Sequence, residues 1–198
     1  MSGDDYVFPE QREWAIELLG WANVPEARDR LVQLVKDKGE SCRKSAIRAL
    51  AASGDARAEG LCIEALSDKD WGCQVAAAEG LGKLGDKKAL DPLVAALKDQ
   101  VPDVRVAAVE ALGKLGDPRA ARSLIQLVEA WQTDIYEPEL IGKAADVLGA
   151  WHVREAVDPL RRALDVSETI SPNGGYIGLL NQMQLHVARA LRRIEGTP

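Results

Sequence analysis

Residues 80–99 read GLGKLGDKKALDPLVAALKD, and the same pattern returns at residues 111–130 as ALGKLGDPRAARSLIQLVEA. A weaker copy, ALAASGDARAEGLCIEALSD, occupies residues 49–68. The copies lie 31 residues apart, so Gly54, Gly85 and Gly116 hold the same position in each. A period of roughly 20–50 residues is typical of stacked supersecondary units that share one continuous core. The repeat therefore predicts one quasi-linear domain over residues 1–198.

Each copy has the pattern of two antiparallel helices. In residues 103–114 the apolar side chains recur at the spacing of one helix face, and Gly113 or Gly116 is expected to end that helix. Asp117 then stands where the next helix needs an N-cap, a position that Asp86 and Asp55 hold in the earlier copies. Asp91, followed by a proline, is expected to supply a further N-cap.

Extended over the chain, this pattern predicts an all-α fold. The first helices of the repeats are expected near residues 10–20, 41–52, 72–83, 103–114, 138–149 and 176–194, and the second helices near 25–37, 56–67, 87–99, 118–131 and 154–165. The repeats then span about 9–37, 41–67, 72–99, 103–131 and 138–165, and the unpaired helix 176–194 caps the array. Insertions at 131–138 and 165–177 lengthen the period and are expected to be loops on one edge of the array, which is often a binding edge.

Composition and charge narrow the class of protein. Hydrophobic residues make up 46% of the chain and the repeated apolar positions are mostly Ala and Leu, which favours packed helices. The net charge of −6 opposes binding to a polyanion. No apolar run approaches the ~18–20 residues that span a bilayer, and the N-terminal residues lack the pattern of a secretion signal. Cys42, Cys62 and Cys73 fall in apolar columns of the repeat, which predicts buried, reduced thiols and a cytoplasmic protein with no membrane association.

One polar stripe on the second helices is a candidate binding surface. Its positions, spaced i, i+4 and i+7, do not repeat from copy to copy, whereas the buried columns do. The stripe either serves solubility alone or forms a composite, polar protein-binding groove. Its residues are Asp29, Gln33, Lys36, Gly60, Glu64, Ser67, Asp91, Ala95, Lys98, Arg122, Gln126, Glu129, Asp158, Arg162 and Asp165.

A neighbouring row is basic in three successive repeats, at Arg57, Lys88 and Arg119. Such a row could hold an acidic partner or a phosphate backbone. Each cation also lies two residues after an aspartate of the N-cap column, so the row could instead neutralise that column. The second interpretation is favoured, and binding by the row stays open.

The few aromatic residues are informative by their position. Exposed Trp and Tyr are enriched in binding hot spots, but they could equally cover helix ends. Trp14 is expected to seal the N-terminal end of the stack, Trp151 to lie in the core and Trp21 at the surface. Four others map to turns between repeats: Trp71, Trp131, Tyr136 and Tyr176.

Catalytic motifs are missing from the sequence. His152 and His186 are its two histidines, and neither is followed by Glu. HExxH, CxxC, GxSxG and phosphate-binding glycine loops are not found. His152 stands where other copies have glycine, which favours a turn residue over a catalyst. The sequence therefore predicts no catalytic residue, no metal ligand and no cofactor.

The pattern [V/C]-R-x-A-A-x-x-A-L-G-x-L-G-D-x-x-A-x-x-x-L resembles the short HEAT repeat of the type first described in phycobilisome lyases. Residues 72–99 and 103–130 carry the resemblance most closely, and it extends over most of the chain. It implies a right-handed α-solenoid of stacked antiparallel helix pairs, with the second helices on the concave face and the first on the convex one. By that resemblance, the exposed residues of the second helices are the default binding surface.

Three functions follow as hypotheses. The first is a non-catalytic, monomeric scaffold or adaptor that binds a protein or peptide on the concave second-helix face and the loops 131–138 and 165–177. The second is a bilin lyase or pigment chaperone, as the namesakes of the repeat imply. The third, less favoured, is a nucleic-acid-binding HEAT-like protein. Deoxyhypusine hydroxylases also use this kind of repeat but rely on paired His-Glu motifs, and these are missing.

Overall fold

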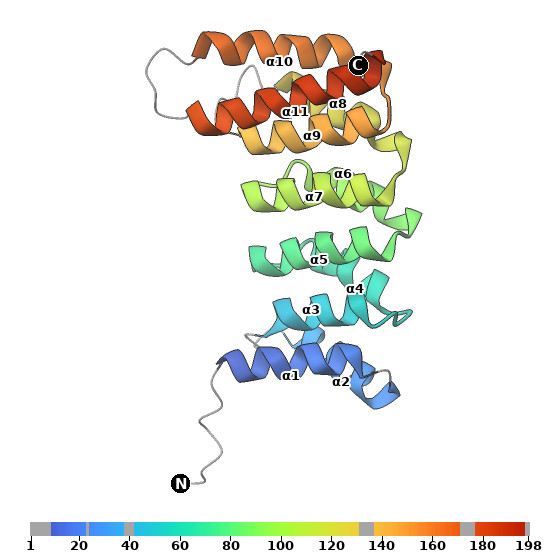
Figure 1. Cartoon of the computed structure of the whole chain (residues 1–198). Coiled ribbons are helices and arrows are strands. Elements are labelled where there is room, and N and C mark those ends of the chain that lie inside the picture. The colour runs from blue at the N-terminus through green and yellow to red at the C-terminus, as the bar shows by residue number, and fades with distance from the viewer. Residues whose placement is uncertain (1–8, 23, 38–41, 131–136, 171–176, 197–198) are drawn as a thin grey trace. The chain divides into compact units, whose positions relative to one another are not determined.

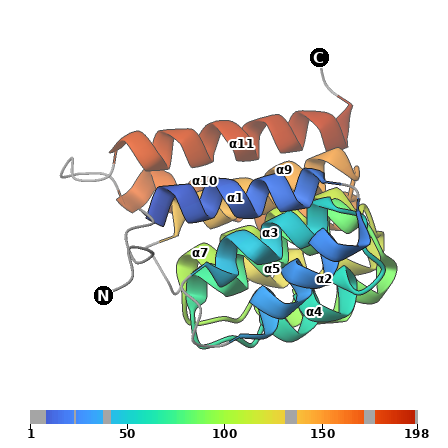
Figure 2. The same cartoon turned by 90° about the horizontal axis from the view of Figure 1, so that it is seen from below.

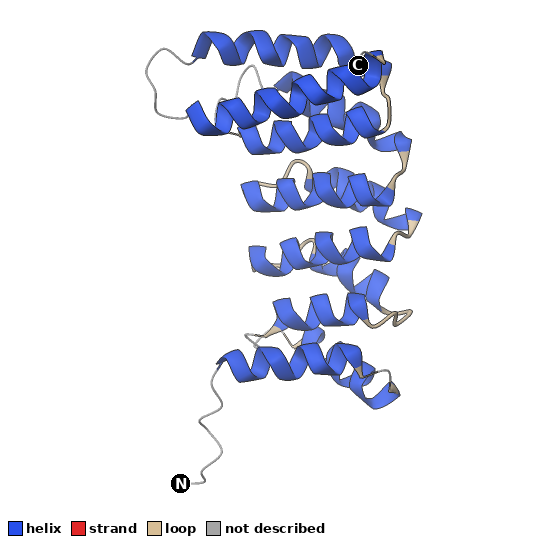
Figure 3. Cartoon of the chain, viewed as in Figure 1, coloured by secondary structure: helices blue, strands red, loops and turns tan. Residues whose placement is uncertain are grey.

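The computed structural model describes residues 9–22, 24–37, 42–130, 137–170 and 177–196. All regular structure in these residues is helical, and Figure 3 shows helices joined by loops without a strand. This confirms the prediction of an all-α, solenoid-type fold of helix pairs. The chain forms two compact units, Met1–Pro92 and Leu93–Pro198. A single domain, a right-handed coil and a concave second-helix face stay predictions.

The first unit contains two layers of helices. Helices α1 (Pro9–Trp21), α3 (Arg43–Ala52) and α5 (Trp71–Leu84) pack side by side in that order and form the first layer. Helices α2 (Pro25–Lys36) and α4 (Ala58–Ala65) pack against them as the second layer, as Figure 2 shows. Fully buried leucines fill the space between the layers, and they include Leu31, Leu50 and Leu81. The short helix η1 (Lys87–Ala89) and α6 (Leu90–Ala96) follow α5.

The second unit repeats this arrangement. Helices α7 (Pro102–Leu115), α9 (Pro138–Ala150) and α11 (Ile177–Glu195) lie side by side, because α9 packs against both of the others (Figure 1). Helices α8 (Ala121–Ala130) and α10 (Val157–Ile170) form the second layer, preceded by the one-turn helices η2 (Pro118–Ala120) and η3 (Arg154–Ala156). The predicted capping helix is α11, which covers α9 and also packs against α10.

The N-cap column predicted from the sequence is present. Asp55, Asp86 and Asp117 each accept a hydrogen bond from the backbone N–H two residues later, at 2.8, 3.0 and 3.1 Å. Such a bond satisfies a backbone donor that the start of a helix leaves without a partner. Asp91, by contrast, lies inside the first turn of α6, so its prediction as an N-cap was wrong. The helical turn already begins at Lys87, with Asp86 as its N-cap, and α6 follows it directly, so residue 91 is not a cap position.

The first helices end as predicted from the glycine column. Gly85 and Gly116 adopt left-handed backbone conformations, with φ of 69° and 67°, and cap α5 and α7. His152 holds the corresponding place after α9 with φ of 53°, although it is not glycine. Its Nδ1 lies 2.8 Å from the backbone oxygen of Arg193, which ties this turn to α11. The interpretation of His152 as a turn residue is confirmed.

Close contact between helices in the second unit depends on two glycines. A Cβ placed on Gly149 of α9 would lie 2.7 Å from the Cα of Ala190 on α11. A Cβ on Gly113 of α7 would lie 2.7 Å from a methyl group of Val147 on α9. Side chains at these positions would hold the helices apart, so glycine sets the spacing of the first layer.

Several finer predictions were wrong. Helix α10 continues to Ile170, so the predicted loop 165–177 is helical over its first part, and residues 171–176 lie outside the described residues. Trp14 is 69% exposed, so its ring is not buried against the end of the stack as a seal would be. Trp151 is half-buried rather than in the core. The prediction that Trp21 lies at the surface is confirmed.

The thiols behave as predicted, since Cys42, Cys62 and Cys73 are free and buried. Burial raises the pKa of Cys62 to about 12 and also raises that of Cys73. A thiol that stays protonated is a poor nucleophile and metal ligand. None of the helices in the described ranges combines the length and the apolar character that crossing a membrane requires.

Candidate binding surfaces

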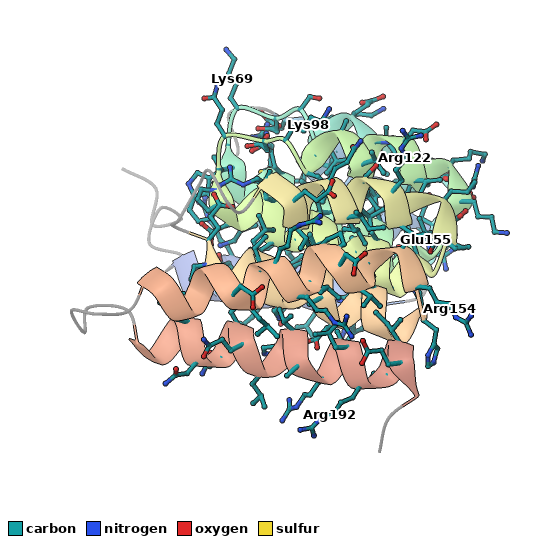
Figure 4. All side chains as sticks on the ribbon, turned by 90° about the horizontal axis from the view of Figure 1, so that it is seen from above. Lys69, Lys98, Arg122, Arg154, Glu155 and Arg192 are labelled. Atoms are coloured by element: carbon teal, nitrogen blue, oxygen red, sulfur yellow. The ribbon has the colours of Figure 1, made fainter. Side chains whose placement is uncertain are left out.

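The predicted stripe on the second helices is exposed throughout. In the first unit it comprises Asp29, Gln33 and Lys36 of α2, Gly60 and Glu64 of α4, Ser67 just after it, and Asp91 of α6. In the second unit it comprises Ala95, Lys98, Arg122, Gln126 and Glu129, followed by Asp158, Arg162 and Asp165 of α10. Figure 4 shows Lys98 and Arg122 pointing outward from the ribbon. Exposure leaves the stripe available to a partner, and its role in binding stays a prediction.

Two ion pairs join neighbouring second helices along the stripe. Arg57, just before α4, contacts Asp29 of α2 with Nη1 and Oδ1 2.7 Å apart. Arg162 of α10 contacts Glu129 of α8 with Nη2 and Oε1 3.2 Å apart. Exposed pairs of this kind contribute little to stability, so a partner can recruit either charge at small cost.

The basic row pairs with the N-cap aspartates. Arg57 donates two side-chain hydrogen bonds to Asp55, at 2.9 and 2.7 Å, and Arg119 contacts Asp117 at 2.7 Å. The hydrogen bond from Arg57 lowers the pKa of Asp55 to about 2, and the two aspartates that Arg57 contacts raise its own pKa. These contacts confirm the predicted neutralisation of the aspartates. Binding by the row is a separate prediction, since the side chain of Arg119 is still 66% exposed.

Lys88 differs from the two arginines of the row. Its Nζ lies 3.3 Å from Glu59 and 3.7 Å from Asp86, so it bridges α4 and the cap of η1. The hydrogen bond to Glu59 raises the pKa of Lys88, and the backbone N–H of Lys88 lowers the pKa of Asp86.

The predicted aromatic sites have mixed outcomes. Trp71 is the first residue of α5 and is 54% exposed, which leaves it free to contact a partner. Trp131, Tyr136 and Tyr176 lie outside the described residues. Their predicted part in binding therefore stays a prediction.

The structure also reveals a groove on the opposite layer of the second unit, which we call the α9 groove. Two hollows form it, with volumes of about 570 and 330 Å³, and Lys143 of α9 lines both. The larger is lined by Glu110, Gly113, Lys114, Lys143, Asp146, Val147, Ala150, Trp151, Arg189 and Arg193. The smaller is lined by Pro138, Glu139, Gly142, Lys143, Gln182, Met183 and His186. Sequence reasoning missed the groove because α10 separates α9 from α11 along the chain.

Charges inside the α9 groove are partly paired. The Nζ of Lys143 contacts the carboxylate of Glu110 on α7, and this hydrogen bond raises the pKa of Lys143. The Nδ1 of His186 lies 2.6 Å from Oδ2 of Asp146. Within the described ranges, no group of three or more His, Cys, Asp and Glu side chains is arranged to hold a metal ion.

Comparison with known protein families identifies the family of this chain. The model for HEAT repeats matches residues 7–59 and 58–136, which together are well over half of the chain. The chain belongs to the HEAT-repeat family. No curated protein sequence matches it. The recognised family agrees with the resemblance noted in the sequence.

Solved structures with a similar fold include other HEAT-like helical proteins. An engineered protein is 18% identical with a TM-score of 0.59, and the alignment covers 97% of this chain and 93% of that one. The complex of CpcE and CpcF of phycocyanin lyase from Nostoc sp. PCC7120 is 20% identical with a TM-score of 0.52, covering 98% and 91%. Human deoxyhypusine hydroxylase in complex with glycerol is also 20% identical, with a TM-score of 0.53, covering 98% and 71%. At these identities the likeness shows the fold alone.

Proposed function

We propose that this HEAT-repeat chain is a non-catalytic scaffold that captures a protein or peptide on the exposed stripe of its second helices. Exposure of the whole stripe carries this proposal, because the same helices are anchored by leucines that are fully buried elsewhere on their surface. Leu31 of α2, Leu124 of α8 and Leu160 of α10 are fully buried. A stripe fixed on such helices loses little conformational entropy when a partner binds.

The chemistry of the stripe fits a polypeptide partner. In the second unit, the stripe contains both Arg122 and Arg162 and the acidic residues Glu129, Asp158 and Asp165. A surface of mixed sign selects a partner with the complementary order of charges and disfavours a uniformly charged polymer. The proposed binder acts as a cytoplasmic monomer, so light scattering should give a mass near 21.4 kDa.

A charge-reversal experiment tests the proposed surface. The variant Arg122→Glu/Arg162→Glu changes the stripe, and Lys83→Glu/Arg192→Glu makes the same change in net charge at exposed positions of α5 and α11. Each tagged protein captures partners from the native cell extract, and mass spectrometry quantifies them. We expect the stripe variant to lose polypeptides that the wild type and the control variant retain.

The comparison requires folded variants, which far-UV circular dichroism checks directly. All four substituted residues are exposed, so we expect helicity to be unchanged in both variants. If the folded stripe variant retains the same partners in the same amounts as the control, the proposed surface is wrong.

A further inference from the structure

The α9 groove combines an excess of positive charge with apolar lining. Lys114 of α7 and Arg189 and Arg193 of α11 line its larger hollow, and all three are exposed. They form no ion pair with any residue in the described ranges. The other charged side chains of this hollow are Lys143, which contacts Glu110, and Asp146, which contacts His186, so its four cations outnumber its two carboxylates. The larger hollow therefore carries an excess of positive charge, although the chain as a whole has a net charge of −6.

The lining between these cations is apolar. Val147 and Ala150 of α9 and Trp151, which follows the helix, line the hollow, and Trp151 is half-buried. Gly113 of α7 and the exposed Ala150 of α9 also line the hollow. A ligand for this site must present both anionic groups and an apolar side chain.

The length of the groove suits a short extended segment. Its lining residues run along α9 from Pro138 to Trp151, which is roughly 20 Å of helix at 1.5 Å per residue. An extended chain covers that length with about six residues. Arg189 and Arg193 are one helical turn apart on α11, so their guanidinium groups can contact successive carboxylates along one edge of such a segment.

We propose that the α9 groove binds an acidic peptide segment of a partner protein, with carboxylates on Lys114, Arg189 and Arg193 and an apolar side chain against Trp151. This site is separate from the stripe of the proposed function, because first-layer helices α7, α9 and α11 form it. A nucleic-acid backbone fits less well. Only three cations of the hollow, Lys114, Arg189 and Arg193, are without an ion pair among the described residues, which is few for a phosphate backbone.

Fluorescence polarisation with defined probes tests the site. The probes are a labelled peptide of alternating Asp and Leu, a matched peptide of alternating Lys and Leu, and a labelled DNA duplex. The site variant is Arg189→Glu/Arg193→Glu. The control is Arg154→Glu/Arg192→Glu, which makes the same change in net charge at exposed arginines that do not line the groove (Figure 4).

The wild type should bind the acidic peptide and not the basic one. We expect the site variant to lose at least about 10-fold in affinity, because charge-assisted hydrogen bonds to both arginines are removed. The control should lose less than about 3-fold, since only the long-range field changes. A second variant, Ala150→Glu, should weaken binding by a similar factor through charge repulsion within the hollow.

Three results would overturn the proposal. They are no binding of the acidic peptide by the wild type, an equal loss of affinity in the site and control variants, and tighter binding of the DNA duplex than of the peptide. The substitutions in this experiment leave the second-helix stripe unchanged, because none of the substituted residues belongs to it. Capture by the stripe can therefore fail or succeed independently of this site.

Discussion

Replacing Gly149 with alanine should destabilise the second unit, although alanine is the better helix former. Gly149 lies in α9, is buried, and faces the backbone of α11. The added Cβ would lie 2.7 Å from the Cα of Ala190 and 2.9 Å from its Cβ. Because the obstacle is backbone, no side-chain rotation can relieve the contact. Helix α11 would have to move away from α9.

Two opposing effects determine how much Gly149→Ala changes the free energy of unfolding. Overpacking a well-packed contact costs about 1–3 kcal/mol, and an obstacle of backbone atoms places Gly149→Ala in the upper part of that range. The better helix propensity of alanine returns up to about 1 kcal/mol. We therefore expect the free energy of unfolding to fall by about 1–2 kcal/mol.

Two other glycines provide matched comparisons. In Gly113→Ala the new Cβ meets a methyl group of Val147, which can rotate, so the loss should be smaller. In Gly60→Ala on α4 nothing lies within 4 Å of the new Cβ, and we expect a gain of about 0.5–1 kcal/mol. Urea unfolding followed by far-UV circular dichroism measures all three. A Gly149→Ala protein as stable as the wild type would refute the close approach of α9 and α11.

Three further predictions concern charge, thiols and pigment. Asp55→Asn should lower the free energy of unfolding at neutral pH, and its difference from the wild type should close between about pH 4 and pH 2. The reason is that the pKa of Asp55 in the folded state is lowered to about 2. The stability that its carboxylate contributes is therefore fully present above the unfolded-state pKa and is lost as the pH falls through the folded-state pKa. A difference in unfolding free energy that does not change with pH would contradict this. Cys62 and Cys73 should react with a thiol reagent at pH ~8 only as fast as the protein opens, because burial raises both pKa values, and rapid labelling of the native protein would show this to be wrong. A linear tetrapyrrole added to the protein should keep its absorbance spectrum, and a shifted band would favour pigment handling over the scaffold.

The helical fold could be predicted because local chemistry repeats at fixed spacing. Gly85 and Gly116 mark helix ends, and Asp86 and Asp117 mark the starts that follow, and all four do so in the structure. The end of α10 at Ile170 was missed because residues after 165 have no counterpart in the other copies. Where a segment has no equivalent in the other repeats, the repeat pattern does not show whether that segment extends a helix or forms a loop.

The candidate sites were only partly accessible from sequence. The second-helix stripe follows from helical periodicity, so positions such as Arg122 and Arg162 could be placed on the surface correctly. The α9 groove depends on the packing of α11 against α9 through Gly149 and Ala190. That contact joins segments about 40 residues apart in a part of the chain where the repeat is weakest. Trp151 was assigned to the core for a different reason, because its column holds Leu84 and Leu115 in the other copies.

Hydroxyl-radical footprinting of the chain, alone and bound to a captured partner, tests the central claim most directly. The account predicts that oxidation falls at stripe residues of the second helices, such as Arg122, Gln126 and Arg162, while exposed residues of α1 such as Trp21 stay as reactive as before. Protection confined to first-layer helices, or no protection on α8 and α10, would contradict it.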